Sequence, residues 1–576
     1  MREISFPCPK ESPGVFFDFG KFFYCFRPSR LRRALWRIGV MGLLLLFLPL
    51  GKGLFSQSPD KNAMKFAKTI TAEDAKKHLS VLASDEYEGR ETGKEGQRKA
   101  AKYIAESFKS SGLKSATDNS YMQQVPLLLS TPGESKFEVG GKQYVNLSDF
   151  YFFPLDEDLK LEAKNILFLG YGISEKFENG EKPEGAIPYD DYEDIDVKGN
   201  ILLVLGGEPV SEDSISFLSG KKDPSKWSTS YRKKIALARN KGAEGMIVVS
   251  SDFESNIESM KEYLESPSLD IEPNADAKKD EEKKNIPQAG ISFKMANEIL
   301  LTQKLSVEEI KKKIQTTKQP FSVEIKLPVA IEITNKAEKI SSENVIGVVE
   351  GTEFRDEVIF ITAHYDHLGV IDGKVFNGAD DDGSGTVAVM EMAEAFAKAK
   401  EAGLGPKRTI VFMTVTGEEK GLLGSSYYTD HPIYPIANTV CDLNIDMIGR
   451  YDEGHKKDSA FVYIIGSDKI STDLHKINEK ANSAYTKLAL DYTYNDPDDP
   501  NRFYYRSDHY NFAEKGIPII FYFNGIHDDY HQETDEISKI NFDLLVKRTQ
   551  LVFYTAWEAA NRKDRIVSDV PQEKKK

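Results

Sequence analysis

Cysteine and histidine are scarce in this chain of 576 residues, which has three cysteines, nine histidines and a formal net charge of -15. The negative balance argues against nucleic acid and against anionic membrane surfaces as partners. Cys8 and Cys25 precede an apolar run at residues 38–50, so cleavage after that run would leave only Cys441 and no internal disulfide. The length exceeds that of one ordinary domain, and we find no internal repeat that would indicate a solenoid.

The N-terminal apolar run is short for a membrane span. About a dozen apolar residues match the length of a signal-peptide core, whereas a spanning helix needs about 20. We therefore predict a signal peptide within residues 1–58 and export to the periplasm or beyond; an uncleaved N-terminal anchor is the alternative. No cysteine follows the run closely, which argues against a lipid anchor. Four arginines precede the run: Arg30, Arg32, Arg33 and Arg37.

The rest of the chain has the pattern of an α/β protein, with short β-branched runs alternating with helical spacing. Residues 72–130 and 340–562 predict two parts of one domain, and residues 563–576 form a charged tail. The intervening residues 163–328 have strands and a helix of their own but no histidine, so we expect an inserted smaller α/β domain without a catalytic metal centre. The strands expected in the second part are 345–349, 358–361, 410–415, 440–445, 461–465 and 517–522, with a last helix over 542–561.

Residues 362–385 contain most of the candidate metal-binding side chains, and they lie between the predicted strand 358–361 and a helix that begins near residue 386. They contain His364 and His367 with the carboxylates Asp366, Asp380, Asp381 and Asp382. Open α/β sheets bind ligands at the carboxyl ends of their strands. Imidazole and carboxylate together suit zinc, or less strongly manganese and cobalt. The alternative is an acidic turn that caps the following helix, with His364 an ordinary strand-end residue.

Four more polar groups follow predicted strands or begin a helix: residues 416–419, 444–446, 506–509 and 529–531. Taken singly, Glu418 and Glu419 could be an acidic helix start, Asp446 a turn residue and His531 a surface histidine. Together they coincide with the ends of predicted strands, whereas charged residues scattered over a surface would not follow strand ends in this way. The joint pattern favours a metal hydrolase.

These motifs resemble the zinc exopeptidases related to bacterial leucyl aminopeptidase and glutamate carboxypeptidase. That resemblance implies a mixed, mainly parallel sheet flanked by helices, and residues 163–328 look like the protease-associated domain that often interrupts these peptidases. The residues that carry it are His364-Tyr365-Asp366, the run 378–382, Gly417-Glu418-Glu419, Asp446, Tyr530-His531, Arg506-Ser507-Asp508-His509 and Glu88-Gly89-Arg90.

The resemblance also implies roles. Asp380 would bridge two Zn²⁺ ions, with Mn²⁺ or Co²⁺ as alternatives, and the Asp380–Asp381 peptide bond would be cis. Glu418 would be the general base, and Asp366 would hold the other nitrogen of the His364 imidazole. The remaining metal ligands would be His364 and Asp446 on one ion, and Glu419 and His531 on the other.

The expected function is that of a zinc-dependent aminopeptidase, which hydrolyses N-terminal residues from peptides with a water held between the metals. A carboxypeptidase of the same fold is the alternative, and Arg506 and Arg502 are candidates to bind its substrate carboxylate. An inactive receptor-like binding protein or a glutaminyl cyclase would also have this fold. The roles of His367 and His509 stay open, and Asp508 is expected to support the site through hydrogen bonds.

Overall fold

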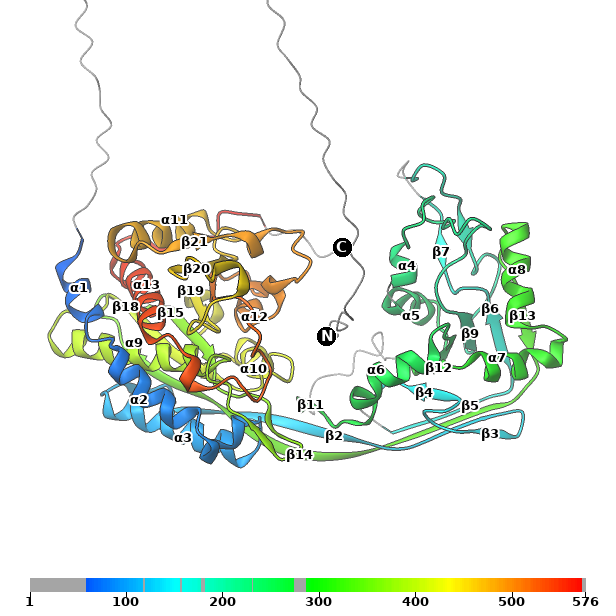
Figure 1. Cartoon of the computed structure of the whole chain (residues 1–576), viewed down its shortest axis with the longest axis horizontal. Coiled ribbons are helices and arrows are strands. Elements are labelled where there is room, and N and C mark those ends of the chain that lie inside the picture. The colour runs from blue at the N-terminus through cyan, green and yellow to red at the C-terminus, as the bar shows by residue number, and fades with distance from the viewer. Residues whose placement is uncertain are drawn as a thin grey trace, which may run out of the picture.

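The computed structural model describes residues 59–571 except 118–119, 156–157, 178–181, 230 and 274–285. The predicted signal segment and two of the three cysteines lie outside the described residues; Cys441 is buried. Two α/β bodies are joined by a long pair of strands, β2 (Met122–Val139) and β14 (Val329–Val349) (Figure 1). Within the described part, no helix has the length and apolarity to cross a membrane.

The larger body is built on a sheet of 12 strands among the described residues, in the main order β11-β2-β14-β18-β15-β19-β22-β20-β21. The four central strands, β18, β15, β19 and β22, run parallel, and β14 and β20 flank them in antiparallel orientation. The strands are β2 (Met122–Val139), β11 (Ser268–Ile271), β14 (Val329–Val349), β15 (Phe354–His364), β18 (Arg408–Val415), β19 (Thr439–Ile445), β20 (Phe461–Ile465), β21 (Ala489–Asp491) and β22 (Ile519–Phe523).

Helices cover both faces of this sheet, so its central strands are largely buried and rich in apolar residues. Alternate residues of β15 face opposite ways: Ile359 and Ile361 belong to the core formed with α9 and α13, whereas Phe360 packs on Tyr428 of α10 and Phe512 of α12. The helices of this body are α1 (Lys61–Ala67), α2 (Ala72–Leu82), α3 (Glu95–Ser110), α9 (Gly383–Glu401), α10 (Leu423–Asp430), α11 (Thr472–Ala481), α12 (His509–Glu514) and α13 (Phe542–Asn561). The predicted strands and last helix of this part of the chain are confirmed.

The smaller body has a six-stranded sheet in the order β13-β6-β9-β10-β12-β4, parallel except at its two edges. Its elements are β4 (Phe150–Phe152), β6 (Ile166–Leu169), β9 (Ile201–Leu205), α5 (Tyr231–Asn240), β10 (Gly245–Val249), α6 (Phe253–Glu265), β12 (Gln288–Ile291), α7 (Phe293–Leu300), α8 (Val307–Thr317) and β13 (Ser322–Ile325).

The strand pair β2–β14 crosses the domain boundaries expected from the sequence. Its near end pairs Met122 with Val345 in the large sheet, and its far end pairs Val139 with Val329, both of which lie in the core of the smaller body. Strand β4 also belongs to the smaller sheet although it precedes residue 163. The smaller body therefore begins earlier than predicted, because the strand pair runs without interruption from one body into the other.

Candidate metal centre

The predicted site residues lie at the carboxyl ends of the four parallel strands of the large sheet. His364 is the last residue of β15, and Glu418 and Asp446 follow β18 and β19. His531 lies in the loop after β22, and Asp381 precedes α9. Strands β18 and β19 pair with opposite edges of β15, so the loops that follow them lie on either side of His364. Open α/β sheets bind ligands in the crevice at such a point.

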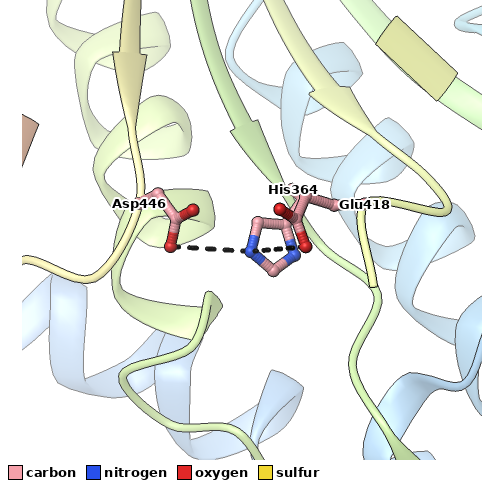
Figure 2. Close-up of side chains that lie close together, drawn as sticks. All are labelled: His364, Glu418 and Asp446. Carbon is pink, nitrogen blue, oxygen red and sulfur yellow. Dashed lines mark ion pairs between the residues drawn. The ribbon is translucent and has the colours of Figure 1, made fainter. Parts of the chain in front are cut away.

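One cluster gathers around His364. Its Nε2 lies 3.6 Å from Asp446 Oδ1, 4.0 Å from Glu418 Oε2 and 3.2 Å from Asp381 Oδ1. Figure 2 shows the imidazole of His364 between the carboxylates of Asp446 and Glu418, each brought in by a different strand end. His364 is 1% exposed, so this charge cluster is shielded from solvent.

A second cluster gathers around Glu419, whose two carboxylate oxygens each meet a histidine. Oε1 lies 2.8 Å from His367 Nδ1, and Oε2 lies 3.2 Å from His531 Nε2. His531 Nε2 is also 3.1 Å from Asp381 Oδ2. Asp381 is thus the carboxylate shared by the two clusters, with one oxygen toward His364 and the other toward His531.

The expectation that Asp380 is the shared carboxylate is wrong by one position. Asp380 accepts hydrogen bonds from the main chain of Gly449 (2.6 Å) and from His527 Nε2 (3.1 Å). Asp381 takes the place between the clusters because successive residues of this loop point in different directions. The cis peptide bond is likewise Asp381–Asp382, not Asp380–Asp381.

The helix-capping alternative is correct for the third aspartate. Asp382 Oδ1 accepts from Gly385 N at the start of α9 and from Met447 N after β19. Three consecutive aspartates therefore have three different partners, and Asp382 ties the start of α9 to the loop that carries Asp446.

Asp366 supports the site in a different way from the one expected. The nitrogen of His364 that faces away from the cluster, Nδ1, meets the main-chain carbonyl of Asp366 at 3.1 Å, whereas the carboxylate is 3.9 Å away. That carboxylate accepts from Thr92 Oγ1 (2.7 Å) and from the main-chain N of Glu418 (3.2 Å). Asp366 therefore holds the backbone that carries the predicted base and, through its carbonyl, orients the histidine.

Two supporting residues had no role assigned from the sequence. Asp535 accepts from the main-chain N of both Asp380 and Asp381, which fixes the loop of the shared carboxylate. Arg90 is buried and donates to the carbonyls of Tyr365 and Gly378, on either side of the site. The Glu88-Gly89-Arg90 motif was the signal for Arg90, whereas nothing in the sequence distinguished Asp535.

Of the histidines left open, only His367 joins a cluster. His509 Nε2 meets the carbonyl of Tyr504 at 2.9 Å, and burial lowers its pKa to about 3, so it is a neutral core residue. Asp508 accepts from Ser425 Oγ (2.5 Å), as a supporting residue would. His527, which had no motif support, holds Asp380.

The two adjacent glutamates have opposite electrostatic environments. Burial raises the pKa of Glu418 well above its usual value; His364 opposes this rise, and the carboxylates of Glu419 and Asp446 reinforce it. Burial and Asp381 act to raise the pKa of Glu419 too, but His531 and His367 outweigh them and lower it to about 2. Divergent pKa values in neighbouring carboxyl groups commonly separate a proton-transfer residue from one that stays ionised.

The donor set fits zinc. His364 Nε2 is buried with no hydrogen-bond partner among the described residues, yet three carboxylates lie within 4.0 Å of it. A carbonyl fixes its other nitrogen, the arrangement usual for a metal-binding imidazole. The candidate donor atoms of each cluster, His364 with Glu418 and Asp446, and His367 with Asp381 and Glu419, lie within 4.8 Å of one another.

Comparison with known proteins agrees with this geometry. Residues 344–556 match the model of peptidase family M28, and residues 169–299 match that of the PA domain. We refer to the part of the chain that matches the M28 model as the M28 domain. The M28 domain thus contains β15, β18, β19, β22 and every strand-end residue of the two clusters, and the PA domain interrupts the chain before it.

Curated relatives of the chain are similar over limited stretches. Aminopeptidase YwaD of Bacillus subtilis is 26% identical over 230 residues, which are 38% of this chain and 46% of the relative. A probable glutamate carboxypeptidase of Arthroderma benhamiae is 40% identical over 105 residues, or 18% of this chain and 14% of the relative. The chain therefore spans less than half the length of either relative. A solved aminopeptidase from Aneurinibacillus sp. strain AM-1 is 18% identical, with a TM-score of 0.49 over 89% of this chain and all of that one.

A pocket opens beside the clusters in the M28 domain. It encloses about 350 Å³, part of it open to solvent, and Asp381, Glu418 and Asp446 form one part of its lining. Its other lining is mostly apolar and aromatic, with one arginine: Met447, Phe503, Phe521, Phe523, Ile526, Tyr530 and Arg506.

Proposed function

We propose that the M28 domain is a zinc-dependent aminopeptidase that binds two Zn²⁺ ions and removes N-terminal residues from peptides. The observation that carries the proposal is the pair of histidine–carboxylate clusters joined by Asp381, with the buried Glu418 beside them. His364 and Asp446 would hold one ion, Glu419 and His531 the other, and Asp381 both.

The chemistry divides between the ions and the chain. Zinc is a Lewis acid, which acidifies water and polarises a carbonyl group. Glu418 Oε2 lies 4.0 Å from His364 Nε2, at the edge of the cluster and in the lining of the pocket. From this position Glu418 would accept a proton from water and return that proton to the departing amine.

Asp366 keeps Glu418 in place during this exchange. Its carboxylate accepts from the main-chain N of Glu418, and Thr92 fixes the same carboxylate from the far side. The pocket beside Glu418, with its apolar and aromatic lining, would receive the side chain of the residue at the scissile bond.

A substrate panel with and without chelator tests the proposal. We expect hydrolysis of aminoacyl p-nitroanilides and of C-terminally amidated peptides, its loss after chelation and its recovery with zinc at about two ions per chain. N-acetylated peptides should be inert. Cleavage only of peptides with a free C-terminus, N-acetylated ones included, would assign a carboxypeptidase instead, and no hydrolysis by the zinc-loaded chain would refute peptidase activity.

A further inference from the structure

Arg506 is the one cation among the described residues that line the pocket beside Glu418. It follows the short helical turn Phe503–Tyr505, and its guanidinium lies over the ring of Phe503, with Cζ 4.9 Å from the ring centroid. Stacking of this kind occupies the face of the guanidinium and leaves its in-plane N–H groups available.

The other arginines near the site have partners for those N–H groups. Arg90 donates to main-chain carbonyls, Arg548 does the same, and Arg450 pairs with Asp529 at 2.9 Å. Within the described part of the chain, the guanidinium of Arg506 has no hydrogen bond and no carboxylate within 4.0 Å; the ring of Phe503 is its side-chain contact. A half-buried cation that keeps its donors unpaired in a ligand pocket is arranged to receive an anion from the ligand.

The rest of the lining defines what kind of anion fits. Phe521, Phe523 and Ile526 offer apolar contact, which suits the methylene groups of a side chain rather than a hydrated inorganic ion. A carboxylate matches the planar guanidinium, which can donate two parallel hydrogen bonds to it. The fitting ligand group is therefore a carboxylate on a short aliphatic stem.

We propose that Arg506 selects peptides that present a carboxylate next to the scissile bond, above all those whose pocket-bound residue is acidic. This inference rests on the proposed function for the identity of the scissile bond, but the pairing of Arg506 with a carboxylate can be measured without turnover. The α-carboxylate of a dipeptide carries the same chemistry, so the test must separate it from a side-chain carboxylate.

Binding to the full zinc-loaded chain carrying Glu418→Gln tests the pairing, because intact peptides can then be titrated by calorimetry. The probes are Glu-Ala-amide, Gln-Ala-amide and Gln-Ala with a free C-terminus. We expect Glu-Ala-amide to bind roughly 10- to 100-fold more tightly than Gln-Ala-amide, the range of a charge-assisted bidentate contact. Tighter binding of Gln-Ala alone would assign the contact to the α-carboxylate; equal binding of the three, or none, overturns the proposal.

Two variants locate the preference. Adding Arg506→Met should reduce the ratio between the glutamyl and glutaminyl peptides to about threefold or less, and Arg506→Lys should retain part of it. Arg502→Met is the matched control: Arg502 is exposed and lies over the Tyr505 ring, with Cζ 4.8 Å from its centroid, outside the pocket lining, so this variant should keep the full ratio. A ratio that survives Arg506→Met refutes the assignment. If Arg506→Met does not fold, the comparison of Glu-Ala-amide with Gln-Ala-amide in the chain that keeps Arg506 still tests whether the pocket prefers a carboxylate.

Turnover separates this inference from the proposed function. In the chain with Glu418 intact, glutamyl p-nitroanilide should have a KM below that of glutaminyl p-nitroanilide by a similar factor. Hydrolysis of both with equal KM and equal binding would sustain the peptidase and refute the role of Arg506. Absence of hydrolysis, with tighter binding of the glutamyl peptide retained, would refute the peptidase activity and sustain the role of Arg506.

Discussion

Replacement of Asp381 by asparagine should abolish metal binding, whereas the same replacement at Asp380 should not. Asp381 places its oxygens 3.2 Å from His364 Nε2 and 3.1 Å from His531 Nε2, so one carboxylate serves both clusters. At an effective dielectric of about 20, a unit charge 4 Å from another contributes about 4 kcal/mol. Loss of one carboxylate charge beside each dication should therefore weaken zinc binding by about three orders of magnitude or more at each position.

Asp380→Asn removes a charge of the same kind one residue away. The amide oxygen can still accept from Gly449 N, but its NH₂ group meets the Nε2–H of His527, since Nδ1 of that ring accepts from Asp529 N. We expect a loss of about 1–3 kcal/mol in the free energy of unfolding and a change in zinc affinity of no more than about 10-fold.

Zinc content by mass spectrometry and the zinc-dependent rise in Tm measure both variants without reference to activity. The Tm of the unaltered chain and of Asp380→Asn should rise with zinc concentration as their zinc dissociation constants dictate. The Tm of Asp381→Asn should not rise at the same zinc concentrations. Retention of two zinc ions by Asp381→Asn, or their loss from Asp380→Asn with the fold intact, would refute the assignment of the shared carboxylate.

Three further outcomes follow from the structure. Glu418→Gln should retain zinc and lose about 10²- to 10⁴-fold in kcat, because the proton carrier is removed while the metal-binding side chains remain. Zinc analysis beside the peptidase assay checks this prediction, and an unchanged kcat would contradict it. His367→Gln removes the 2.8 Å contact between His367 Nδ1 and Glu419 Oε1, so zinc affinity should fall about 10- to 100-fold and excess zinc should restore turnover. His431 lies outside both clusters, so His431→Gln is the control. Glu391 is buried on α9, and burial raises its pKa to about 8 from 4.5. The folded state keeps this proton where the unfolded chain has released it, so unfolding free energy should fall as pH rises from about 5 to 8. Glu391→Gln should reduce that loss by about 1–3 kcal/mol in chemical denaturation, and an unchanged pH dependence would contradict the assignment.

The order of the motifs along the chain was sufficient to place most of the site. His364, Glu418, Asp446 and His531 each follow a short apolar run that became a central parallel strand, and parallel strands bring their carboxyl ends to one edge. Because both faces of this sheet are covered, those runs are rich in apolar residues and easy to identify.

The choice between Asp380 and Asp381 was beyond the sequence. In a loop, neighbouring carboxylates have the same chemistry, and the backbone dihedrals decide which one enters the site. Here the main-chain N of both residues donates to Asp535, more than 150 positions away, and that contact sets the direction of the loop. The role of Asp366 had the same limit, since its carbonyl and not its carboxylate meets His364.

The sequence by itself determined the α/β class, the strands of the M28 domain, the separate inserted domain and the residue types at each strand end, because these depend on local periodicity and spacing. Only the tertiary structure decided which aspartate is shared, that His367 supports Glu419, and that Arg506 enters the pocket with its donors free. Those outcomes depend on the directions of side chains from distant segments, and no local pattern encodes a direction that is fixed by contacts across the sheet.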